Sequence, residues 1–83
     1  MHVQLRFFAS LREALGAAGE LTLPEGAPVG QARDALIARG VPFDAALARG
    51  RALRAALNQT LCDEAAVLKA GDELAFFPPV TGG

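Results

Sequence analysis

The last residues carry the most distinctive chemistry of this 83-residue chain. The sequence ends Phe-Phe-Pro-Pro-Val-Thr-Gly-Gly, from Phe76 to Gly83, with no charged side chain. An α-carboxyl has a pKa of about 3.3 to 3.7, so the Gly83 carboxylate is ionised at neutral pH and can attack the α-phosphate of ATP when an enzyme aligns the two. A sulfur nucleophile opens the resulting acyl-adenylate to a thiocarboxylate, whereas a thiol followed by an amine gives an isopeptide. The terminus therefore predicts a carrier that partner enzymes modify at Gly83.

We expect the residues before Gly83 to thread a narrow tunnel in another protein. Glycine has no side chain, and two prolines lower the entropy that is lost when a tail is held extended. We therefore predict one domain over residues 1–77 and an extended, mobile tail over residues 78–83. The threading segment consists of Pro78, Pro79, Val80, Thr81 and Gly82.

Few other side chains offer catalytic chemistry. Cys62 is the single cysteine and has no nearby histidine to lower its pKa, which favours an inert, half-buried thiol. His2 is expected to be solvated, and Asp63–Glu64 and Asp72–Glu73 flank turns as solvated loop charges. No Cys or His pair has the spacing of metal ligands, and no glycine-rich nucleotide loop is present. We expect no catalytic residue, no metal and no bound cofactor.

Composition argues against several classes of partner. The formal net charge is -1 and the basic residues are scattered, whereas nucleic-acid binding needs clustered Lys and Arg. No uncharged stretch approaches the roughly 20 apolar residues that span a bilayer. A single cysteine and the absence of a secretory signal indicate a protein of the reducing cytoplasm.

Hydrophobic periodicity predicts the first half of the fold. Alternation over residues 2–8 predicts a strand, with Val3, Leu5 and Phe7 facing the core. Ser10 and Glu13 have the spacing of a capping box, which predicts a short helix from Ser10 to Gly16. Residues 21–23 are predicted as a second strand. Helical spacing then predicts the main helix, from Pro28 to about Gly40.

The second half of the chain is less regular. Residues 44–50 resemble a capped helical turn, and residues 51–57 fit either a helix or a strand, with the strand narrowly favoured. Asn58 and Gln59 can turn the chain into a short strand over residues 60–62, and residues 73–77 form the last strand, which Pro78 must end. This order predicts an α+β domain in which the main helix covers one face of a mixed sheet.

The alternation also predicts an apolar patch at the root of the tail. If residues 3, 5 and 7 face the core, Phe8 points the other way, and Phe77 does the same on the last strand. Exposed aromatic residues next to the tail are what a docking partner needs. Leu61 is a weaker third candidate. The alternative, that one phenylalanine covers a sheet edge or packs under the short helix, is left open.

Taken together, these residues resemble the molybdopterin synthase small subunits, a family of ubiquitin-like sulfur carriers in the molybdenum cofactor pathway. The strongest match is residues 72–83, with their Phe-Phe-Pro-Pro-Val-Thr-Gly-Gly end. Supporting matches are Phe7-Phe8-Ala9, Leu11-Arg12-Glu13, Gly16 and Asn58-Gln59-Thr60-Leu61.

The resemblance implies a β-grasp fold and a chain that is not itself catalytic. By this resemblance an ATP-dependent activating enzyme adenylates Gly83, and a sulfur donor protein converts it to a thiocarboxylate. The tail then enters the large synthase subunit and delivers sulfur to cyclic pyranopterin monophosphate. Phe8, Leu61 and Phe77 match positions that face the large subunit, in a heterotetramer with two small subunits. ATP is consumed by the activating enzyme and is not bound by this chain.

Three other functions remain open at this point. A sulfur carrier for thiamine or another thio-compound is disfavoured by the Phe-Phe-Pro-Pro stretch. A protein modifier attached to lysines through Gly83 uses the same activated carboxylate, so sequence chemistry does not separate it from a sulfur carrier. A plain interaction domain with a frayed tail predicts that loss of Gly83 leaves the function intact.

Overall fold

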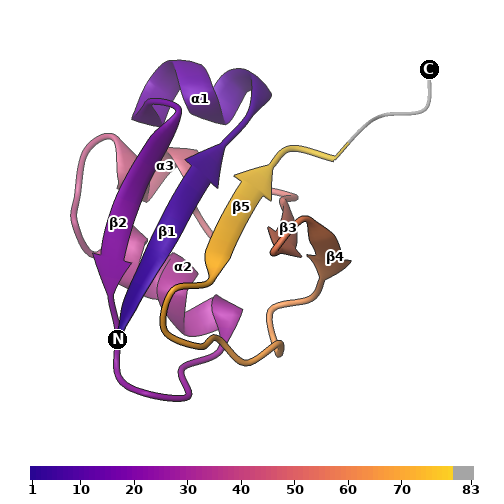
Figure 1. The fold of residues 1–83 in the computed structure, drawn as a ribbon. Helices are drawn as coiled ribbons and strands as arrows, with labels where there is room; N and C mark the ends of the chain where they lie inside the picture. The colour runs from indigo at the N-terminus through magenta and orange to yellow at the C-terminus, as the bar shows by residue number, and fades with distance from the viewer. Residues whose placement is uncertain (80–83) are drawn as a thin grey trace.

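The computed structural model describes residues 1–79 as one mixed sheet with three helices. The elements are β1 (His2–Phe7), α1 (Ala9–Leu15), β2 (Ala18–Thr22), α2 (Val29–Ile37), α3 (Phe43–Ala46), β3 (Arg54–Leu57), β4 (Thr60–Cys62) and β5 (Glu73–Phe77). The sheet order is β2-β1-β5-β3-β4. The pair β1 and β5 is parallel and lies at the centre (Figure 1), and the other pairs are antiparallel. This topology confirms the predicted β-grasp fold.

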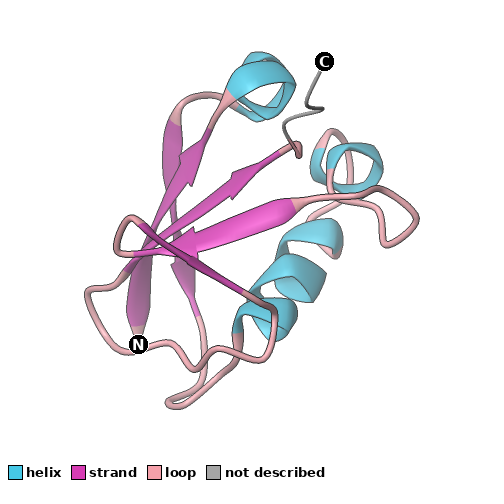
Figure 2. Cartoon of the chain, turned by 90° about the vertical axis from the view of Figure 1, so that its right-hand side faces the viewer, coloured by secondary structure: helices cyan, strands magenta, loops and turns pink. Residues whose placement is uncertain are grey.

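The core lies between the sheet and α2, which runs along one face of the sheet in Figure 2. Val3, Leu5 and Phe7 of β1 are at most 2% exposed, and the residues between them are exposed. On α2, Val29, Ala32 and Leu36 are fully buried, at the spacing of one helix face. Both predicted periodicities are confirmed. We call the sheet face opposite α2 the outer face.

The predicted capping box of α1 is wrong. The helix begins at Ala9, its N-cap is Phe8, and no side chain caps it. Ala9 has φ of 54°, so the chain turns one residue earlier than expected and places Ser10 inside the first turn. The predicted end is confirmed: Gly16 has φ of 89°, and its amide donates to the Arg12 carbonyl at 2.9 Å.

The second strand begins three residues earlier than predicted. It spans Ala18–Thr22, because β1 continues to pair with it as far as Arg6, opposite Ala18. Alanine and glycine are weak strand formers, so the ladder with β1 decides the structure there. Leu23 lies just beyond the strand, although its amide still donates to the Met1 carbonyl at 2.9 Å.

The narrowly favoured strand near residue 55 is confirmed as β3. Its alanines suit a helix, but β3 pairs with β5 on one side and β4 on the other, and these ladders override the local preference. Asn58 and Gln59 have φ of 50° and 69°, as a two-residue hairpin turn requires. The last strand, Glu73–Phe77, matches its prediction.

Within residues 1–79, no helix has the length and apolar character that crossing a bilayer requires.

Candidate functional site

An apolar pocket of about 450 Å³ lies on the outer face of the sheet and runs along β5, from Glu73 to Pro78. Strand register defines its floor, because Ala56 of β3 lies opposite Ala75 of β5. Both alanines are at most 9% exposed, so little polar backbone is accessible there. The pocket is lined by Phe8, Ala9, Ala56, Gln59, Glu73, Ala75, Phe77 and Pro78.

Phe8 and Phe77 form one wall of this pocket. Phe7 lies opposite Phe76 in the ladder of β1 and β5, so the next residue of each strand projects to the outer face. The Phe8 amide donates to the Phe76 carbonyl at 3.4 Å, which holds the two strand ends together. Phe8 is 43% exposed and Phe77 is half-buried. The predicted apolar patch is therefore present, and its role as an interface remains a prediction.

Two tight backbone turns shape the rim of the pocket. Ala9 adopts a left-handed conformation that non-glycine residues rarely use, and this turn leaves Phe8 standing out from the sheet. At the opposite rim, the Asn58 side chain joins the β3–β4 turn to the start of β5. Its Nδ2 donates to Asp72 Oδ1 at 3.0 Å, and its Oδ1 accepts from the Glu73 amide at 2.9 Å. These bonds place Gln59 beside Glu73.

Leu61 shares the outer face but does not line the pocket. It lies on β4 opposite Ala56 and is 66% exposed, one strand further from β5. The sequence patterns did not indicate Ala9, Ala56 and Gln59 as pocket residues, although they predicted the outward position of Phe77. The missing information was that β3 pairs with β5, a non-local contact with no local signal.

The pocket lies where β5 passes into the C-terminal segment. Pro78, the first residue after the strand, lines it, and Pro79 is half-buried. Val80, Thr81, Gly82 and Gly83 lie outside the described residues, as does most of the predicted mobile tail.

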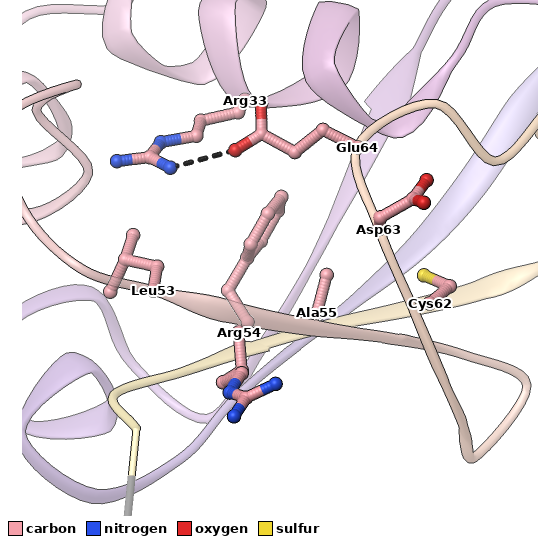
Figure 3. A pocket seen from close by; sticks show the side chains of 8 residues that line it. Arg33, Leu53, Arg54, Ala55, Cys62, Asp63 and Glu64 are labelled. Carbon is pink, nitrogen blue, oxygen red and sulfur yellow. Dashed lines mark hydrogen bonds and ion pairs between the residues drawn. The ribbon is translucent and has the colours of Figure 1, made fainter.

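A second pocket, of about 270 Å³, lies between the β3–β4 hairpin and α2 (Figure 3). Arg33 of α2 lies beside it with only 4% of its surface exposed. Its guanidinium donates to the carbonyls of Leu47, Ala48 and Arg51 at 2.8, 2.6 and 3.1 Å. Among residues 1–79, no buried side-chain nitrogen or oxygen lacks a hydrogen-bond partner, so the buried polar atoms beside this pocket are engaged within the protein.

Glu64 is not the solvated loop charge that the sequence suggested. Its carboxylate accepts from Arg33 Nη1 at 2.9 Å and also from Arg49, which bonds Asp34 as well. Burial opposes ionisation of Glu64, but the hydrogen bonds from Arg49 and Arg33 outweigh it and lower the pKa of that carboxyl. Asp72 is also engaged, since its Oδ2 accepts from the Lys69 amide at 2.7 Å. These carboxylates hold loops together.

Cys62 is half-buried on β4, as expected for an inert thiol. Burial, and then the nearby charge of Asp63, raise the pKa of the Cys62 thiol, which lowers the fraction of reactive thiolate. His2 is exposed, with its Nδ1 3.3 Å from the Thr22 hydroxyl. Within residues 1–79, no three His, Cys, Asp or Glu side chains are placed to hold a metal ion.

Two relatives match this chain over nearly its full length. The molybdopterin synthase sulfur carrier subunit of Haemophilus influenzae is 42% identical over 77 residues, which are 93% of this chain and 94% of the relative. The protein of the same name from Escherichia coli is 40% identical over 81 residues, covering 98% of this chain and 99% of the relative.

Solved structures with the same fold also cover the whole chain. SAMP1 of Haloferax volcanii superposes with a TM-score of 0.78 at 30% identity, covering 100% of both chains. A chain from the complex of subunits 1 and 2 of the molybdopterin-converting factor of Helicobacter pylori has a TM-score of 0.68 at 26% identity, again covering 100% of both chains. The model of the ThiS family matches residues 5–83. This chain therefore belongs to the ThiS family.

Proposed function

We propose that this chain is the sulfur carrier subunit of a molybdopterin synthase. The observation that best supports this proposal is an apolar pocket at the start of a C-terminal segment that ends in Gly82 and Gly83. Two relatives at 40% and 42% identity are named molybdopterin synthase sulfur carrier subunits. A pocket beside the tail suits a protein that docks on a partner while its terminus reacts there.

In this proposal the chemistry takes place at Gly83. A carboxylate oxygen attacks the α-phosphate of ATP in an activating enzyme, pyrophosphate leaves, and an acyl-adenylate remains. Hydrosulfide supplied by a donor protein then attacks the acyl carbon and displaces AMP, which carries away one terminal oxygen, so that sulfur replaces this oxygen. The thiocarboxylate sulfur forms a bond to cyclic pyranopterin monophosphate, and water then cleaves the bond between this sulfur and the acyl carbon, which returns the Gly83 carboxylate. Two such transfers build the dithiolene. Catalytic groups come from the partner enzymes, and this chain supplies the terminus.

The large synthase subunit is the proposed partner at the pocket. The Helicobacter pylori structure is a complex of subunits 1 and 2 of the molybdopterin-converting factor, which supports an equivalent pairing here. Phe8 and Phe77 would be the apolar anchors, with Leu61 at the margin. Pro78 to Gly82 would thread toward the active site, and two small subunits would complete a heterotetramer. The single cysteine suits the reducing cytoplasm, where we expect the carrier to work.

The intact mass of this chain, measured after incubation with its activating enzyme, ATP and a sulfur donor, tests the proposal. We expect one oxygen to be replaced by sulfur, and no change in a variant that lacks Gly83. The thiocarboxylated chain should then support molybdopterin formation by the large subunit. An unchanged mass with a demonstrably active enzyme contradicts the proposal.

A protein modifier is the second candidate. SAMP1 of Haloferax volcanii, which covers this whole chain at 30% identity, is named a small archaeal modifier protein in a second crystal structure. A modifier would form high-mass conjugates through Gly83, and these would be visible in the same incubation when protein substrates are added. Conjugates that form while the large subunit makes no molybdopterin would favour the protein modifier over the sulfur carrier.

A further inference from the structure

The outer face of the sheet carries two arginines on either side of β5. Arg6 of β1 lies opposite Ala75, and Arg54 of β3 lies opposite Phe77. Both arginines are exposed. They lie on the two strands that neighbour β5, near the C-terminal end of β5. They therefore flank the apolar pocket near the root of the C-terminal segment.

Neither arginine is committed to a partner within the described part of the chain. Arg33, Arg39 and Arg49 donate side-chain hydrogen bonds inside the protein, whereas no hydrogen bond or ion pair joins the side chains of Arg6 or Arg54 to any of residues 1–79. Asp63 is the acidic residue nearest in register to Arg54, but its carboxylate accepts from the Ala65 amide at 2.8 Å. Figure 3 shows the Arg54 side chain pointing away from Arg33 and Glu64.

The charge on the outer face is polarised along β5. Apart from Asp63, whose carboxylate accepts from the Ala65 amide, the acidic residues of this face are at the other end. Glu73 begins β5, and Glu20 lies on β2 opposite Gln4, which in turn lies opposite Glu73. Gln4 Nε2 donates to Glu20 Oε1 at 3.2 Å, so Glu20 stays at that end of the face. A carboxylate on a docked protein is attracted at the arginine end of the pocket and repelled at the glutamate end.

We propose that Arg6 and Arg54 bind carboxylates on the large synthase subunit and thereby orient the docked carrier with its tail toward the active site. A guanidinium presents a planar pair of donors that matches a carboxylate, and the apolar pocket between the arginines receives the partner's apolar side chains. An apolar pocket and two separate cations fit a protein surface better than a phosphate backbone, which needs clustered basic residues. This inference rests on the proposed function, and it adds the chemistry of the partner surface.

The test is the rate of association with the large subunit, measured by stopped-flow at several ionic strengths. The Arg6→Glu/Arg54→Glu variant should associate about tenfold more slowly at low ionic strength, and the difference should shrink as salt is added. The milder Arg6→Gln/Arg54→Gln variant should fall between this variant and the unaltered chain. Lys69→Glu is the control for the Arg6→Gln/Arg54→Gln variant, because Lys69 is exposed, lies before the start of β5 at the other end of the strand, and its reversal changes the net charge equally.

Each outcome of this experiment is decisive. Association of the Arg6→Gln/Arg54→Gln variant at the rate of the Lys69→Glu chain overturns the role of the arginines, while binding of the unaltered chain leaves the proposed function standing. A slower rate with no dependence on salt overturns the electrostatic proposal as well, because it would indicate lost packing. Failure of the large subunit to bind the unaltered chain at any ionic strength overturns both the proposed function and this inference.

Discussion

The Arg33 guanidinium donates to the Glu64 carboxylate at 2.9 Å, across a separation of 31 residues. This contact joins α2 to the loop after β4, and Arg33 also binds three carbonyls between residues 47 and 51. The side chain of Arg33 is 5% exposed and that of Glu64 is 39% exposed, so the pair stands at the border between core and solvent. One buried cation thus connects α2 to two segments that carry no regular structure of their own, residues 47–51 and the loop after β4.

Replacing Glu64 by glutamine should lower the free energy of unfolding by about 1 to 2 kcal/mol. Loss of one partner from a buried pair costs about 3 to 5 kcal/mol, and the exposure of Glu64 reduces this figure because water screens the charge. Urea denaturation at pH 7 measures the change. Glu13→Gln is the control, since Glu13 is exposed on α1, and an equal loss in both variants would remove the special role of Glu64.

The same carboxylate predicts a pH dependence of stability. The pKa of Glu64 is lower in the folded protein than its usual value, which is about 4.3 in an unfolded chain. Ionised Glu64 therefore stabilises the fold fully above that value, and this contribution is lost as the pH falls through the folded pKa. Urea midpoints measured from pH 6 downward should fall less steeply for Glu64→Gln than for the unaltered chain. Parallel curves would contradict the prediction.

The close approach of Glu64 explains why Gly30 occupies the first turn of the main helix. A Cβ built on Gly30 would lie 3.1 Å from Glu64 Oε1 and 3.4 Å from the Glu64 carbonyl oxygen, and the Gly30 amide donates to that carbonyl at 2.9 Å. Alanine in place of a helical glycine normally stabilises a protein by about 0.5 to 1 kcal/mol. We expect Gly30→Ala to destabilise this one instead, because Glu64 must move away from Arg33 and Arg49.

Thermal denaturation compares this variant with Gly50→Ala, where the new Cβ meets no atom within 4 Å and φ is not in the left-handed region. Gly50→Ala should leave the melting temperature unchanged or raise it slightly. A higher melting temperature for Gly30→Ala would contradict this prediction, because it would show that the loop after β4 moves aside without a loss of stability.

The thiol of Cys62 should react slowly with iodoacetamide near neutral pH. Burial and the charge of Asp63 raise its pKa, so little thiolate is present. Asp63→Asn removes the smaller of the two causes and should increase the rate modestly. Denaturing the protein should increase it more, and reaction of the folded chain at the rate of a free cysteine would contradict the assignment.

Local sequence patterns predicted the elements that bury one face against the core and expose the other. The alternation in β1, the 3.6-residue spacing in α2 and the prolines after β5 each report a local physical constraint. All three elements are present, and α2 ends at Ile37, before the expected end near Gly40. The outward parity of Phe8 and Phe77 followed from these strands, so one wall of the pocket was predictable as well.

Features that depend on distant pairing were not predictable. Arg33 lies among polar residues of α2 in sequence, and nothing local shows that Glu64 and three carbonyls surround it. The floor of the pocket needs β3 beside β5, which the ladder between Ala56 and Ala75 provides. The predicted capping box was wrong because the chain turns at Ala9, so the helix begins before Ser10.

Phe77 provides the sharpest test of the pocket as a docking site. An aspartate at this position places a charge in an apolar pocket, so we expect Phe77→Asp to weaken binding to the large subunit by at least about 2 kcal/mol, the range of an interface anchor. Phe77 is half-buried at the end of its strand, so circular dichroism must show that the fold persists. Val41→Asp is the control, because Val41 is 86% exposed and does not line the pocket. Calorimetry that gives equal affinities for these two variants would place the large subunit elsewhere on the molecule.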